Sequence, residues 1–170
     1  MMTPTFSWAA RRARRTNYTI GTDPGKTGAI AAVDGDGAVA WTWILKKRTH
    51  REIIDLLRAH ADCPVMLERQ FPVHGQGLTS TFTPAEGYGV LVGIVEALGL
   101  PLHLCRAQDW QRVMLAGEGK ASGPDLKRLY VGVAERLWPS ISFRGPRGGI
   151  DDGKAAACLI AEYGRRTLTR

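Results

Sequence analysis

A chain of 170 residues, 44% of them apolar, is long enough for one domain with a well-packed core. Lys and Arg number 23 against 16 acidic residues, and the resulting charge of +7 favours a polyanionic partner such as nucleic acid. No stretch approaches the roughly 18 consecutive apolar residues needed to cross a bilayer, and three cysteines without paired spacing argue against a disulfide framework and a zinc site. We expect Cys63, Cys105 and Cys158 to be buried free thiols.

Residues 1–16 are basic, and no acidic residue precedes Asp23. This segment lacks the apolar core of a secretory signal. It could be an organellar transit remnant, a DNA-binding arm or a frayed tail. We expect a basic flexible tail, followed by a single domain over residues 17–166. The arginines of this tail are Arg11, Arg12, Arg14 and Arg15.

The first part of the domain is predicted to be three antiparallel strands. One strand covers residues 17–22 and ends at Asp23-Pro24-Gly25, where Pro and Gly mark a sharp turn. Two β-favouring stretches, 28–34 and 38–45, flank Asp34-Gly35-Asp36-Gly37. Asp-Gly between two apolar runs is a strong hairpin signal.

The rest of the chain alternates helices with short strands. Thr49, followed three residues later by Glu52, is a capping-box pattern that predicts a helix up to about residue 61. The order β-β-β-α-β-α-β-α-α-α predicts an α/β layer fold with strands of mixed direction. The other predicted elements are a buried strand at 64–68, a loop at 70–84, a helix at 85–98 ended by Gly99, a strand at 101–105, and helices at 107–115, 125–138 and 152–165.

Acidic residues lie at the ends of elements that are far apart in the sequence. Asp23 follows the first strand, Glu68 ends the buried strand, and Asp151 and Asp152 open the last helix. Carboxylates at element ends can converge in a fold, and three or four of them hold Mg²⁺ or Mn²⁺, which prefer oxygen ligands. On a basic chain, this pattern indicates a metal-dependent nuclease.

Each acid also has an ordinary structural explanation. A carboxylate that ends a buried strand, as Glu68 does, is costly unless it is paired or bound to metal. The ordinary explanations are a turn before proline for Asp23, an ion pair with Arg69 or Arg106 for Glu68, and helix capping for Asp151 and Asp152.

Three segments together resemble the active-site segments of RuvC-type Holliday junction resolvases. They are Ile20-Gly-Thr-Asp23-Pro-Gly, Met66-Leu-Glu68-Arg-Gln and Asp152-Gly-Lys-Ala-Ala-Ala-Cys-Leu-Ile-Ala161. Gly87-Tyr88-Gly89 and Trp110 resemble the branch that contains the plant chloroplast resolvase. The resemblance runs from about residue 18 to 165. It implies a ribonuclease H-like fold, with a mixed five-stranded sheet flanked by helices.

The same resemblance implies a structure-selective endonuclease of DNA recombination and repair. A homodimer, joined through the helix at 86–98, would nick a four-way junction symmetrically, using two Mg²⁺ ions per site, or Mn²⁺ in their place. Asp23 would bridge both ions, Glu68 would hold one, and Asp152, or Asp151 in its place, would complete the other. A lysine would help to neutralise the phosphate, with Lys120 as the first candidate and Lys127 as the second.

Further residues are candidates for DNA contact. Aromatic side chains on the loop at 70–84 could wedge between bases at the crossover, or could simply anchor the loop. Basic side chains of the C-terminal half are predicted to meet phosphates. The loop candidates are Phe71, His74, Gln76 and Phe82, and the basic ones are Lys127, Arg128, Arg144 and Arg147.

One position departs from the family pattern. The family's last helix usually reads Gly-basic-Ala-Asp-Ala-Leu, and here Ala156 occupies the place of that Asp. Residue 156 lies one helical turn beyond Asp152, on the same face. Either the alanine was introduced to trap uncut DNA, or the protein evolved a reduced site. In both cases we expect the chain to cut poorly.

Three other functions fit parts of the sequence. The first is a catalytically inactive junction-binding protein, and the second is a ribonuclease H-like nuclease that acts on RNA or RNA–DNA hybrids. The third is a fragment of an actin-like sugar kinase, because residues 21–27 resemble its first phosphate motif, although such kinases need a second domain. Heavy use of Ala, Arg and Gly indicates a GC-rich genome, so we expect the cytoplasm of a bacterial or phage-infected cell, with an organelle as the alternative.

Overall fold

The computed structural model describes residues 17–25, 27–71, 78–145 and 147–168, and for residues 78–84 it describes the backbone alone. The predicted basic tail at 1–16 therefore lies outside the described residues. The order of elements along the described chain is β-β-β-α-β-α-β-α-α-α, as predicted.

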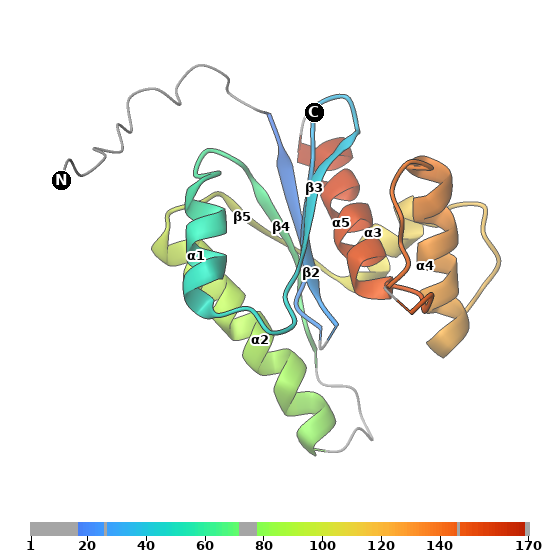
Figure 1. Cartoon of the computed structure of the whole chain (residues 1–170), viewed down its shortest axis with the longest axis horizontal. Coiled ribbons are helices and arrows are strands. Elements are labelled where there is room, and N and C mark those ends of the chain that lie inside the picture. Colours follow the sequence, from blue (N-terminus) through green and yellow to red (C-terminus); the bar gives the residue numbers. More distant parts are fainter. Residues whose placement is uncertain (1–16, 26, 72–77, 146, 169–170) are drawn as a thin grey trace.

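A five-stranded sheet forms the centre of the fold (Figure 1). Its spatial order is β3-β2-β1-β4-β5, with β2 antiparallel to both β1 and β3, and with β4 and β5 parallel to β1. The prediction of a mixed sheet that begins with three antiparallel strands is confirmed. The strands are β1 (Thr19–Asp23), β2 (Ala29–Val33), β3 (Val39–Ile44), β4 (Val65–Glu68) and β5 (Leu102–Cys105).

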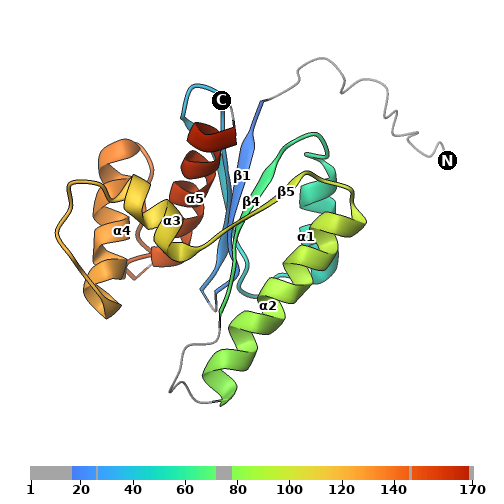
Figure 2. The same ribbon diagram turned by 180° about the vertical axis from the view of Figure 1, so that it is seen from behind.

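Helices cover both faces of the sheet, and each face has its own apolar core. Figures 1 and 2 show α1 and α2 on one face and α3, α4 and α5 on the other. None of the helices in the described ranges is both long and apolar enough to span a membrane. The helices are α1 (His50–Arg58), α2 (Leu78–Ala97), α3 (Ala107–Met114), α4 (Gly123–Leu137) and α5 (Asp152–Leu168).

Helix α5 packs directly on β1 because small residues line their contact. A Cβ atom on Gly21 would lie 2.2 Å from the backbone nitrogen of Ala161, so only glycine fits at this crossing. At the start of α5, a Cβ atom on Gly153 would lie 1.9 Å from the carbonyl oxygen of Thr27. These two close approaches bring the first turn of α5 beside the end of β1.

Several local predictions are confirmed. The Thr49 hydroxyl accepts a hydrogen bond from the Glu52 backbone N–H, and the Glu52 carboxylate accepts one from the Thr49 backbone N–H, which completes the capping box of α1. Gly99 has a φ of 67° just past the end of α2, where this left-handed conformation ends a helix. All three cysteines are buried, and none of them forms a disulfide.

The predicted loop at 70–84 is wrong in its second half, because α2 already begins at Leu78. The sequence predicts a loop because residues 70–84 are rich in Gly, Thr and Ser, which are weak helix formers. Here Pro84 lies inside a helix of 20 residues. Phe82, predicted to lie on a loop, therefore belongs to α2.

Candidate functional site

The topology places Asp23 and Glu68 side by side. Strands β1 and β4 are parallel, and Thr22 of one pairs with Leu67 of the other. The next residue of each strand, Asp23 and Glu68, is also its last. Carboxyl ends of neighbouring parallel strands lie at the same edge of a sheet, where ligand sites of α/β proteins commonly form.

Helix α5 brings the third acid to this edge. Asp152 is the first residue of α5 and lines the same cleft of about 500 Å³ as Asp23 and Glu68. Lys127 and Tyr130 of α4, together with Trp110 of α3, line other parts of its wall. Acids from three remote segments therefore line one cleft.

The electrostatics of Asp23 reflect this convergence. The pKa of Asp23 is raised to about 7, chiefly by burial and then by the charges of Glu68 and Asp152, while the hydrogen bond from the Gly25 backbone and the charge of Lys127 act in the opposite direction. The Gly25 backbone N–H donates to Asp23 Oδ1 at 2.9 Å, so Asp23 also serves as a turn residue. The cleft thus holds negative charge that the protein only partly compensates.

Glu68 is held by two hydrogen bonds rather than by the ion pair with Arg69 or Arg106 considered above. Trp110 Nε1 donates to its Oε2 at 2.6 Å, and Gln70 Nε2 donates to its Oε1 at 3.1 Å. Burial raises the pKa of Glu68, and these two hydrogen bonds partly counter that rise. Arg106 instead pairs with Asp109 at 3.0 Å.

Two further wall residues are coupled to this network. The Tyr130 hydroxyl accepts a hydrogen bond from Gln111 Nε2 at 2.6 Å, and the Tyr130 ring lies 5.0 Å from that of Trp110. Burial, followed by the charges of Glu68, Asp23 and Asp152, raises the pKa of Tyr130, which keeps its hydroxyl neutral. Sequence reasoning gave no role to Gln70, although it is the last residue of the Met66–Gln70 segment, and it missed Tyr130, which lies in no recognisable motif.

The two acids at the start of α5 have different surroundings in the structure. The Asp151 carboxylate accepts a hydrogen bond from the Lys154 backbone N–H at 3.1 Å, which caps the helix. Asp152 lines the cleft, and Asp151 does not. Of the two candidates for a metal ligand, Asp152 therefore has the suitable position.

Of the two candidate lysines, only one lines the cleft. Lys127 Nζ lies 2.7 Å from Asp152 Oδ2, inside the cleft. Lys120 is exposed in the segment between α3 and α4, and it does not line the cleft. Ala156 also lines the cleft, at the position where the family pattern has an acid.

Of the predicted DNA-contacting residues, Lys127 lines the cleft, whereas Phe71, Arg128, Arg144 and Arg147 do not. The Phe71 side chain is 51% exposed and stacks under the Arg69 guanidinium at 4.9 Å. Arg128 pairs with Asp125 at 2.7 Å, Arg144 pairs with Glu135 at 3.2 Å, and Arg147 is exposed. His74, Gln76 and the side chain of Phe82 are outside the part of the chain that the structure describes.

The chemistry of the donor set fits a hard divalent cation. Within the described ranges, no three Asp, Glu, His or Cys side chains gather closely enough to enclose an ion by themselves. Mg²⁺ is usually held by one or two carboxylates, with water and substrate phosphate filling its other positions. Asp23, Glu68 and Asp152 suit that open arrangement.

The strand order and the helices on both faces define this chain as a protein with a ribonuclease H-like fold. The structure of Thermus thermophilus RuvC matches it with a TM-score of 0.61 and 19% identity, over 89% of this chain and 97% of that one. T. thermophilus RuvC in complex with Holliday junction substrate also matches, with a TM-score of 0.61 and 16% identity, over 86% and 92% of the two chains. No protein-family model and no curated protein sequence matches. These similarities establish the fold, and membership of the chloroplast resolvase branch stays a prediction.

Proposed function

We propose that this protein is a divalent-cation-dependent endonuclease that resolves four-way DNA junctions as a homodimer. The observation that carries the proposal is the convergence of Asp23, Glu68 and Asp152 in one cleft of a RuvC-like fold. The charge of +7 suits a phosphate backbone, and one of the two RuvC structures above contains a Holliday junction.

The roles of the cleft residues follow from their chemistry. Asp23, Glu68 and Asp152 would hold Mg²⁺, which Mn²⁺ can replace. Bound cation would supply activation of water and stabilisation of charge on the leaving oxygen. Trp110 fixes the orientation of the Glu68 carboxylate, and Lys127 brings positive charge to the cleft, where a scissile phosphate would lie.

Trp110→Phe is expected to lower the affinity for Mn²⁺ by about 10- to 100-fold. Phenylalanine preserves much of the ring packing but removes the N–H that holds Glu68 Oε2. Calorimetric titration with Mn²⁺ measures the change. Trp138→Phe is the matched control, because it removes an indole hydrogen bond to Gly37, remote from the cleft. Equal affinities of the two variants would contradict a positioning role for Trp110.

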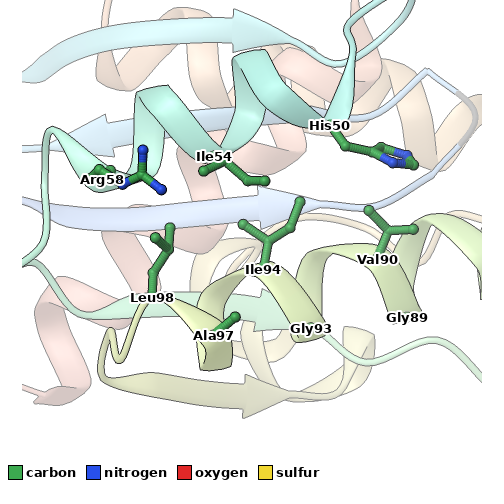
Figure 3. Close-up of a pocket in the computed structure, with 9 residues that line it drawn as sticks. All are labelled: His50, Ile54, Arg58, Gly89, Val90, Gly93, Ile94, Ala97 and Leu98. Atoms are coloured by element: carbon green, nitrogen blue, oxygen red, sulfur yellow. The ribbon is translucent and has the colours of Figure 1, made fainter.

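A second surface fits a partner subunit. Helix α2 carries only two charged residues, Glu86 and Glu96, so it is apolar on nearly every side. Gly89, Gly93 and Ala97 recur every four residues on its exposed side. A cleft of about 460 Å³ follows this stripe between α2 and α1, and Figure 3 shows Ile54 of α1 facing Ile94 of α2 across it. A small-residue stripe allows a second copy of α2 to approach closely in a two-fold dimer.

Gly93→Arg is expected to convert the dimer to monomers. A Cβ atom on Gly93 meets nothing within 4 Å in its own chain, so the larger residue is tolerated in the monomer and clashes only with a partner. Light scattering coupled to gel filtration measures the mass. Gly119→Arg, at another open glycine away from α2, serves as the control. A dimer that persists in Gly93→Arg would place the interface elsewhere.

Cleavage of a synthetic four-way junction in Mg²⁺ tests the proposed function directly. Symmetric nicks with 5′-phosphate ends, and weak activity on duplex DNA and RNA–DNA hybrid, are the expected result. Preferential cutting of the hybrid would favour a ribonuclease. The absence of an acid at Ala156 favours a second candidate function, an inactive junction-binding protein; tight binding without cutting in Mg²⁺ or Mn²⁺ would support it.

A further inference from the structure

The ion pair between Lys127 and Asp152 lines the cleft, with the Lys127 side chain 52% exposed. Lys127 Nζ is 2.7 Å from Asp152 Oδ2, and the Asp152 side chain is only 20% exposed. The two residues come from different helices, α4 and α5, so the pair is set by tertiary packing. At this distance the ammonium neutralises one of the three acids that line the cleft.

The neighbouring position carries no charge. Ala156 is 4% exposed and lines the cleft one turn beyond Asp152. A four-acid site would balance two dications. Here three acids, once ionised to bind a cation, face one lysine, which leaves two net negative charges, the charge that one dication balances.

Given the proposed function, we propose that the Lys127 ammonium takes the place of one of the two cations, so that this cleft binds a single divalent ion. Asp23 and Glu68, the neighbouring acids at the ends of β1 and β4, hold that ion. The two-ion arrangement implied by the family resemblance then does not apply to this chain.

A second dication would face two obstacles. It would have to displace the ammonium from a largely buried carboxylate, and it would then remain near that ammonium with no added acid to offset their repulsion. An acid at position 156 would supply the missing negative charge. Removal of the lysine would free Asp152 to act as a ligand.

Counting bound Mn²⁺ per chain tests this inference without any need for activity. Electron paramagnetic resonance of free Mn²⁺ during a titration gives the stoichiometry. We expect one ion for the unmodified chain, two for Lys127→Met and two for Ala156→Asp. Lys127→Arg, which keeps the charge, and Lys46→Met, an exposed lysine outside this cleft, should each bind one.

The outcomes separate this inference from the proposed function. Two ions in the unmodified chain, or one ion in a folded Lys127→Met variant, would overturn the role of Lys127 while leaving a metal-dependent nuclease intact. No bound ion in the unmodified chain, together with no junction cleavage, would overturn the proposed function itself. Circular dichroism of each variant establishes whether it is folded. Two ions bound to Lys127→Arg would also overturn the inference, whatever Lys127→Met binds.

Discussion

Ala156→Asp is expected to raise the rate of junction cleavage by at least about 10²-fold. A preorganised charge at a reaction centre typically contributes this much. Position 156 lines the cleft beside Asp152, so the new carboxylate would point toward the same cations. Single-turnover cleavage of a four-way junction in Mg²⁺ measures the effect. Ala156→Asn, which is similar in size but uncharged, should give no gain.

The same substitution is expected to make stability depend on metal. Ala156 is 4% exposed, and a fourth acid in the cleft adds repulsion that only a cation relieves. In EDTA, Ala156→Asp should therefore melt at a lower temperature than Ala156→Asn. Saturating Mg²⁺ should reverse that order, because a ligand that binds only the folded state stabilises it. If neither the cleavage rate nor the melting temperature of Ala156→Asp depended on Mg²⁺, an acid at position 156 would not take part in metal binding.

The strands and most of the helices could be predicted from the sequence because their signals are local. The Asp-Gly turn after β2, the capping box of Thr49 and Glu52, and Gly99 beyond α2 each depend on residues within a few positions of one another. The neighbouring positions of Asp23 and Glu68 depend on the parallel pairing of β1 with β4, which we did not predict from the sequence.

The remaining features depend on contacts that spacing cannot reveal. The hydrogen bond from Trp110 to Glu68 joins residues 42 positions apart. Which lysine lies near the acids depends on how α4 packs against α5, because that packing brings Lys127 of α4 next to Asp152 of α5. The early start of α2 goes against the local preference of Pro84, so nothing in that segment of the sequence indicates it.

Asp23→Asn is expected to reduce cleavage by at least about 10³-fold and, without metal, to stabilise the fold. The reduction is best measured in the Ala156→Asp background, where the rate is high. Asparagine keeps the oxygen that accepts from the Gly25 backbone N–H, so the turn survives. It removes a carboxylate whose charge is disfavoured by burial and by Glu68.

The sign of the stability change follows from the raised pKa. The ordinary pKa of this aspartate is 3.8, and in the folded chain it is about 7. Between these values the unfolded chain releases a proton that the folded chain retains, so stability falls as the pH rises. The penalty is nearly complete about one pH unit above 7, and at about 1.36 kcal/mol per pKa unit it amounts to roughly 4 kcal/mol at most.

Chemical denaturation in EDTA at pH 4.5 and pH 8 measures this contribution. Asp23→Asn and the unmodified chain should differ little at pH 4.5, and the variant should be more stable at pH 8. Asp62→Asn, at an exposed aspartate, should show no such pH-dependent difference. If Asp23→Asn were more stable by the same amount at both pH values, the raised pKa of Asp23 would not be the cause. A carboxylate kept for binding a cation should cost stability only when it is ionised and no cation is present.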